Sequence, residues 1–353
     1  MSIGDNDVPF LRVAGSPQDM GHKHGATFSP LIRSLFRSRM AILEQCCKPC
    51  AKSNIQETAE HLLLSLSEID LDLFAEINAV AFSAGLSPWQ LIVAGGYTDI
   101  IDILRPIQEA GPDHECTLAV DPAKGYIAGT WDSHLSARDS LIVLERHPDK
   151  GLATLALTTA GWPCQQGVNS QGLAFAITNL TPQCARSSGL IYIAANAVVA
   201  GARSVADACE TFSKLRFCSG HSYVLTGGDG AGAIIETTGE NSRVFHVNTL
   251  TTKANHYWGG KEAIDDNRSY AYLEGSLTRE AELRKNLSGE IDPATFRLCL
   301  TRCNSVNRTD EKGNGVTCAH FVISARDRSL CYQKGPALLA GNMNRWHQRS
   351  LKS

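Results

Sequence analysis

Hydrophobic residues in the first hundred or so positions recur at helical spacing. Apolar side chains fall every three or four residues over 28–47, and a second such stripe runs over 55–84. Ser87 followed by Pro88 is typical of a helix start, because Ser can cap free backbone amides and Pro suits the first helical position. This start predicts a third helix over 89–104. The pattern therefore predicts a helical N-terminal segment.

Beyond a polar, turn-rich stretch at 109–115 the pattern changes to short apolar runs separated by Gly, Pro and Asp, which is typical of hairpins. The predicted strands are 117–120, 126–131, 141–145, 153–159, 173–178, 222–226, 233–237, 244–247, 251–254, 317–324 and 329–333. The predicted helices between them are 191–199, 204–214, 268–286 and 293–303. Strands in runs and helices in runs favour a layered α+β fold over alternating β-α-β units.

Composition narrows the class of protein. The 353 residues have 43% hydrophobic content, 20% charged content and a net charge of -3, as in soluble globular chains. This near-neutral balance provides no overall field for nucleic acid or an anionic membrane. No apolar run reaches the roughly 18 residues of a membrane span, and the acidic residues 1–7 do not form a secretory signal. We therefore expect a cytoplasmic protein with neither nucleic-acid nor membrane partners.

Cysteine is the unusual residue type, with twelve in the chain. Reduced thiols that pack as small apolar residues are the default in a cytoplasm. Cys116 differs because it follows the polar loop and starts the first strand. If the two runs after it form a hairpin, Asp132 at the far end lies beside Cys116. The alternative is a strand-end cysteine with no chemical role.

Other candidates come from turns near predicted strands. Asn255 and His256 follow a strand; they form either a simple turn or a site in which the Asn amide donates to an oxyanion. His114 is two residues from Cys116, and in a strand that spacing places both side chains on one face. His114 is therefore a candidate base for the Cys116 thiol. Gly161 and Trp162 follow another strand and are candidates for a pocket wall. No motif predicts a metal or a cofactor.

Several motifs, taken in order, resemble the acyl-coenzyme A:6-aminopenicillanate acyltransferase family, the cysteine N-terminal-nucleophile amidohydrolases of peptidase family C45. Each motif is weak alone, but together they span nearly the whole chain in the family's order. They are Gly21-His22-Lys23-His24-Gly25, Glu115-Cys116-Thr117, Gly129-Thr130-Trp131-Asp132, Thr159-Ala160-Gly161, Val168-Asn169-Ser170-Gln171-Gly172 and Ala254-Asn255-His256.

The resemblance implies a four-layer αββα fold and a precursor that cuts itself before its cysteine. The chain would then divide into a helical segment, 1–115, and a catalytic domain, 116–353. Cys116 would be the nucleophile, Asp132 the catalytic Asp, Asn255 the oxyanion donor and Arg308 a site arginine. The sequence departs from the family at Glu115, where Gly is usual, and at Thr130, where Asn is commoner.

Cleavage would give Cys116 a free α-amine, which titrates at about 7.7–8.0 and can take the thiol proton. A small-molecule amide would then acylate the thiol, and water or an amine would receive the acyl group. One alternative is an uncut thiol hydrolase with His114 or His256 as base; another is an inactive binding member of the family. The sequence leaves the substrate and any homo-oligomer open.

Overall fold

Helices occupy most of the chain before residue 105 in the computed structural model of the protein. The structure describes residues 8–47, 52–105, 115–259, 266, 268–287, 291–300, 302–303, 305–308, 315–335 and 346–351. The N-terminal helices are α1 (Pro17–Cys46), α2 (Lys52–Ile69), α3 (Leu71–Ala84) and α4 (Pro88–Leu104). The later ones are α5 (Leu135–Asp139), α6 (Tyr192–Val199), α7 (Val205–Lys214), α9 (Tyr270–Asn286) and α10 (Pro293–Leu300).

Helix caps account for one difference from the predicted helices. The apolar stripe over 55–84 is divided between α2 and α3 at Asp70, whose carboxylate accepts a hydrogen bond from Leu73 N at 2.9 Å and so starts a new helix. Ser87 begins α4 as predicted, with Gln90 completing a capping box. Gly85 ends α3 with a φ of 70°, a conformation that Gly adopts without strain.

The strands form two sheets within the described residues. They are β1 (Phe10–Gly15), β2 (Thr117–Asp121), β3 (Tyr126–Ser133), β4 (Leu141–Pro148), β5 (Thr154–Thr159), β6 (Gln166–Asn169), β7 (Leu173–Asn179), β8 (His221–Gly227), β9 (Gly232–Thr237), β10 (Ser242–His246), β11 (Thr251–Lys253), β12 (Val316–Ser324), β13 (Ser329–Lys334) and β14 (His347–Ser350). One sheet has the order β1-β4-β5-β6-β7-β8-β9-β10, and the other β11-β2-β3-β12-β13-β14. β1, β6 and β14 were not predicted, and β1 pairs in parallel with β4, so the N-terminal segment also contributes a strand.

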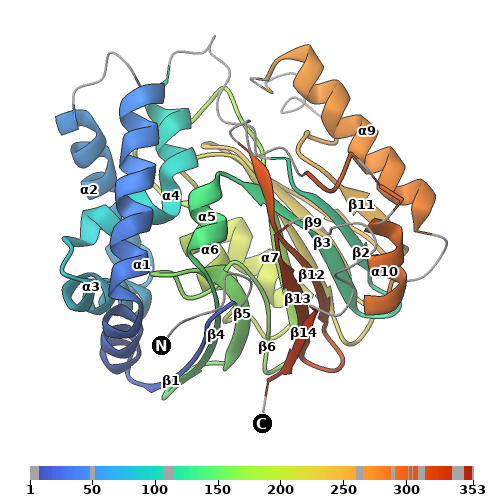
Figure 1. The fold of residues 1–353 in the computed structure, drawn as a ribbon, viewed down its shortest axis with the longest axis horizontal. Helices are drawn as coiled ribbons and strands as arrows, with labels where there is room; N and C mark the ends of the chain where they lie inside the picture. The colour runs from blue at the N-terminus through green and yellow to red at the C-terminus, as the bar shows by residue number, and fades with distance from the viewer. Residues whose placement is uncertain are drawn as a thin grey trace.

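Alternating side chains sort the molecule into four layers. In β4, Ile142 and Leu144 face the helical core that holds α1–α4, α6 and α7, whereas Leu141 and Val143 face a second core between the sheets. A third core packs the outer face of the second sheet against α9 and α10, through residues such as Leu283 and Phe296. Figure 1 shows this order, with α1–α4 on one side, the sheets between and α9 and α10 on the other. The predicted αββα arrangement is confirmed.

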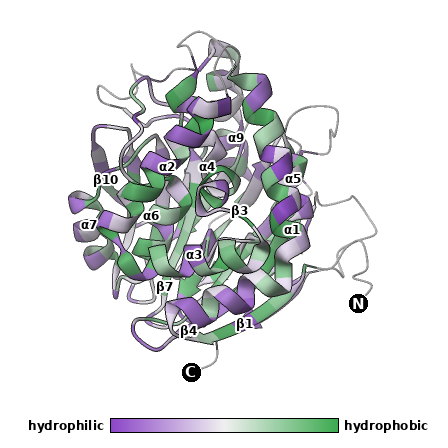
Figure 2. Ribbon diagram, turned by 90° about the vertical axis from the view of Figure 1, so that its left-hand side faces the viewer, coloured by the Kyte–Doolittle hydropathy of each residue, from purple (hydrophilic) through white to green (hydrophobic). Residues whose placement is uncertain are grey.

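The hydropathy of the helices differs between the centre and the edge of the molecule. α4 is largely hydrophobic and central, whereas α7 at the edge of the molecule is largely hydrophilic (Figure 2). No single helix in the described part of the chain is long and apolar enough to cross a membrane, although α3 and α4 together pass by length and composition with a bend of 109°.

The first motif of the sequence holds α1 against α3. A Cβ at Gly21 would lie 2.4 Å from Glu76 O, and one at Gly25 would lie 2.4 Å from Val80 O, so only Gly allows this close approach. His24, between them, accepts a hydrogen bond from Gly161 N at 3.0 Å. The motif therefore fixes the N-terminal helices to the end of β5.

Candidate active site around Cys116

Cys116 lies directly before β2 and beside the end of β3. The two strands pair with Thr117 opposite Thr130, which is the predicted hairpin. This register brings the Cys116 sulfur to 3.4 Å from both the backbone N and the backbone O of Asp132. Burial, and next the charge of Asp132, raise the pKa of the thiol to about 12. In this structure the thiol is therefore protonated at neutral pH and is a weak nucleophile.

The Asp132 carboxylate is buried and only partly hydrogen-bonded. Thr130 Oγ1 donates to Asp132 Oδ2 at 3.2 Å, while Oδ1 has no hydrogen-bond partner among the described residues. Burial raises the pKa of Asp132 to about 7, although the Thr317 hydroxyl and the guanidinium groups of Arg279 and Arg308 oppose the rise. Asp132 thus has one carboxylate oxygen without a hydrogen-bond partner in the described structure, and its charge acts on the Cys116 thiol.

Glu115, the residue before the thiol, is held by two arginines. Its Oε2 lies 3.1 Å from Arg279 Nη1 and 2.8 Å from Arg308 Nη1. Arg308 was a candidate from the sequence, and the structure places it against Glu115, while its role in a site remains a prediction. Arg279 was missed. It belongs to the buried face of α9 together with Ser276 and Leu283, so an arginine within a helix's inward stripe is the signal that could have found it.

Asn255 is fully buried, and both ends of its side-chain amide are hydrogen-bonded. Its Nδ2 donates to Asn179 O at 2.9 Å, and its Oδ1 accepts from Arg279 Nη2 at 3.1 Å. Arg279 therefore links Glu115 to Asn255. The predicted role of Asn255 as oxyanion donor requires its amide to change partners, so it remains a prediction.

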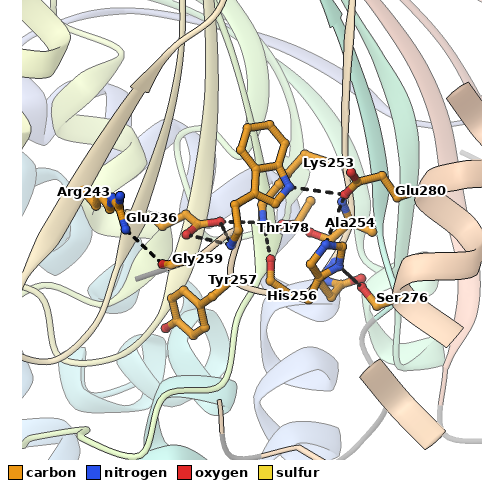
Figure 3. Close-up of polar contacts among 12 residues, drawn as sticks. Thr178, Glu236, Arg243, Lys253, Ala254, His256, Tyr257, Gly259, Ser276 and Glu280 are labelled. Atoms are coloured by element: carbon orange, nitrogen blue, oxygen red, sulfur yellow. Dashed lines mark hydrogen bonds and ion pairs between the residues drawn. The ribbon is translucent and has the colours of Figure 1, made fainter. Parts of the chain in front are cut away.

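A buried ion pair between Lys253 and Glu236 stabilises the turn that carries Asn255. Lys253 Nζ lies 2.6 Å from Glu236 Oε1, and both side chains are almost fully buried. Glu236 also accepts from Trp258 N at 3.1 Å, and Lys253 donates to His256 O, which fixes both ends of the turn (Figure 3).

Of the two histidines proposed as alternative bases, His256 and His114, the structure describes only His256. His256 Nδ1 contacts Ser276 Oγ at 2.9 Å and its Nε2 lies 3.5 Å from Glu280, as Figure 3 shows. Burial, and next the charge of Lys253, lower its pKa to about 3. The ring is thus engaged on the α9 side of the turn. His114 lies outside the described residues.

A small cavity of about 30 Å³ adjoins the Cys116 thiol, with room for about one water. It lies between α4 and the two sheets; its lining includes Tyr97, Asp132, Asn179, Tyr192 and His221. Asn179 was not predicted. Its Oδ1 is buried without a hydrogen-bond partner in the described part of the chain, and its place in the cavity makes it a second amide near the thiol.

Gly161 and Trp162 lie in the helical core rather than in the lining of this cavity. Trp162 is fully buried and donates from Nε1 to Leu91 O at 3.1 Å. Gly161 has a φ of 102° and packs beside Ile32. In the uncut chain both residues hold α1 and α4 to the sheet, and the proposed pocket wall remains a prediction. Among the described residues, no group of three or more His, Cys, Asp or Glu side chains converges to hold a metal ion.

Two sheets packed face to face between helical layers, with a cysteine opening an inner strand, define the N-terminal-nucleophile hydrolase class of fold. The family model of acyl-coenzyme A:6-aminopenicillanic acid acyl-transferase matches residues 120–335, and the chain belongs to this family. Membership places it among hydrolases and acyltransferases that act on amides. The matched region includes Asp132, Asn255 and Arg308 but begins after Cys116.

Solved structures add two distant likenesses. A variant of conjugated bile acid hydrolase from Clostridium perfringens is 16% identical, with a TM-score of 0.43, covering 67% of this chain and 92% of that one. Penicillin V acylase from Agrobacterium tumefaciens is 10% identical, with a TM-score of 0.41, covering 62% of this chain and 82% of that one. No curated protein matches the sequence significantly.

Proposed function

We propose that the chain is a self-processing cysteine amidohydrolase or acyltransferase, cut between Glu115 and Cys116. One observation carries the proposal: the Cys116 sulfur lies 3.4 Å from the backbone of Asp132, whose buried carboxylate keeps one oxygen without a hydrogen-bond partner in the described structure. An ammonium group formed at Cys116 by cleavage would provide the missing partner. Family membership supports amide chemistry at this site.

Self-cleavage begins when Cys116 Sγ attacks the carbonyl carbon of Glu115. The bond from that carbon to Cys116 N breaks, the nitrogen takes the thiol proton, and a thioester joins the two residues. Water then attacks the thioester, which frees the Glu115 carboxyl and returns a proton to sulfur. The ion pairs from Arg279 and Arg308 hold the acyl residue still during these steps.

Turnover follows the same bond changes with an external amide. The α-amine of Cys116 takes the thiol proton, the sulfur attacks the amide carbonyl, and the amine product leaves with that proton. Asn255, released from Asn179, and a backbone N–H stabilise the oxyanion; one such donor contributes about 2.7–4 kcal/mol. Water or a second amine then takes the acyl group. A cytoplasmic location belongs to the same proposal, because a reducing compartment keeps the thiol unoxidised.

Mass spectrometry and a denaturing gel of the purified protein test the proposal together. We expect two fragments of about one third and two thirds of the chain, the larger starting at Cys116 and gaining an acyl mass with a bound amide. Cys116→Ala should give one uncut, inactive band, whereas Cys318→Ala, at another buried cysteine near Asp132, should still be cut. An active Cys116→Ala protein would refute the mechanism, and an intact active chain would favour the uncut thiol hydrolase.

A further inference from the structure

Two arginines share a single carboxylate oxygen of Glu115, and the next carboxylate whose pKa their charges affect is Asp132. Arg279, with a side chain only 3% exposed, and Arg308 both contact Glu115 Oε2. In the described part of the chain, Glu115 is the one carboxylate within ion-pair distance of either arginine. Arg279 Nε is also buried, with no acceptor among the described residues. Two guanidinium groups thus form a built site for a carboxylate.

The position of the Glu115 carboxylate indicates where the acyl group of a substrate would bind. In the self-cleavage proposed above, Glu115 is the acyl group that Cys116 attacks, and an external amide must bring its own carbonyl to the same sulfur. Glu115 is therefore the first acyl group that the site accepts. When Glu115 departs, Arg279 and Arg308 lose the carboxylate that lies within ion-pair distance, and the loss is costly until another anion takes its place.

We propose that the mature enzyme selects amides whose acyl group bears a carboxylate separated from the scissile carbonyl by three carbon atoms, as in a glutaryl group. That spacing reproduces the Glu115 side chain, and Arg279 and Arg308 determine the preference. The inference rests on the proposed function, since it requires turnover at Cys116. A glutaryl amide acylates the sulfur and releases its amine with the thiol proton; water then breaks the thioester and releases glutarate.

Two chromogenic amides of equal acyl length test this selection: N-glutaryl-4-nitroanilide and N-pentanoyl-4-nitroanilide. Both have the same leaving group, so their kcat/KM ratio isolates the terminal carboxylate. The free energy of a hydrogen bond to a charged group corresponds to a factor of about 10 to 100 in kcat/KM. We expect the processed protein to prefer the glutaryl amide by that factor. Arg279→Gln should lower the ratio several-fold, because Arg308 remains, and the exposed Lys285→Gln on the same helix should leave it unchanged.

The ratio also removes any general effect of Arg279 on Asn255, because such an effect lowers turnover of both amides. Equal turnover of the two amides by a cut protein would overturn the anionic subsite and leave the proposed function standing. If the cut protein turns over neither, alkylation of Cys116 by iodoacetamide decides: stronger protection by glutarate than by pentanoate supports the subsite, and equal protection overturns it. A chain that stays intact with an unreactive Cys116 refutes the proposed function itself.

Discussion

Changing Asp132 to Asn should make the uncut chain more stable above neutral pH, although it removes a residue proposed to be essential. Asp132 is buried, and its pKa of about 7 lies well above the usual 3.8. The folded chain therefore holds the Asp132 proton at pH values where the unfolded chain has released it. Protonated Asp132 stabilises the fold fully below about pH 4, and this stabilisation is lost as the pH rises toward 7.

The size of the effect follows from the two pKa values. One pKa unit corresponds to about 1.4 kcal/mol, so ionised Asp132 lowers the free energy of unfolding by about 4 kcal/mol above pH 7. At pH 4.5 the loss is only about 1 kcal/mol, which leaves about 3 kcal/mol of pH-dependent destabilisation between pH 4.5 and 8. Asn cannot ionise. Its amide lacks an acceptor where Oδ1 now lies, but that penalty is the same at both pH values.

Urea unfolding of Cys116→Ala, with and without Asp132→Asn, measures this difference without interference from cleavage. We take the unfolding free energy of the double variant minus that of Cys116→Ala. We expect this difference to rise by about 3 kcal/mol from pH 4.5 to pH 8. Asp121→Asn is the control: Asp121 is also buried and accepts from Lys124 N, so Asn there should cost stability at both pH values. Parallel pH profiles for parent and Asp132→Asn would refute the reasoning.

Three further outcomes follow from other contacts in the structure. Glu115→Gln in the Cys116→Ala chain should lower the unfolding free energy in urea by about 2 kcal/mol, because two arginines lose their carboxylate; unchanged stability would contradict the ion pairs. Burial raises the pKa of Asp102 in α4 to about 7, and Ser219, on the other side of the proposed cut, donates a hydrogen bond to it. Because ionised Asp102 is destabilised in the assembled protein, the two fragments should separate in less urea at pH 8.5 than at pH 5 on gel filtration. Asp102→Asn should abolish that difference. Gly95→Ala would place a Cβ 2.2 Å from the Trp162 ring and should cost about 1–3 kcal/mol with a changed tryptophan emission; a wild-type melting curve would argue against this packing.

The sequence predicted the layers better than it predicted their edges. Periodicity indicated most helices and inner strands, because each buries one face against a single core. It missed β1, whose pairing partner β4 lies more than a hundred residues later, and parallel pairing leaves no local turn to detect. It also joined α2 to α3, because the apolar stripe continues in phase through the cap at Asp70.

The site was predictable where it depends on a local hairpin. Cys116 and Asp132 are joined by the β2–β3 register, which short runs and turn residues specify. Arg279 depends instead on how α9 docks over β2 and β11, a tertiary contact without a local sequence signal. Asn179 likewise reaches the cavity from the far end of β7 in the other sheet. The sequence also did not reveal that Trp162 lies in the helical core, because a Gly-Trp pair after a strand does not show which core it enters.

The charges around residues 115 and 116 indicate a direction for the proposed cleavage. Before the cut, Asp132 is a buried carboxylate with one unpartnered oxygen in the described structure. The burial of Cys116 and next the charge of Asp132 raise the pKa of the Cys116 thiol and hold it protonated. Cleavage would create an ammonium at Cys116, and an opposite charge at that distance lowers a carboxyl pKa. Asp132 would then be ionised at pH 7 without the cost of about 4 kcal/mol that it carries in the uncut chain. The new charge would also favour the thiolate. The cut that forms the base would thus relieve the destabilised carboxylate and activate the sulfur together, which favours cleavage over re-formation of the bond.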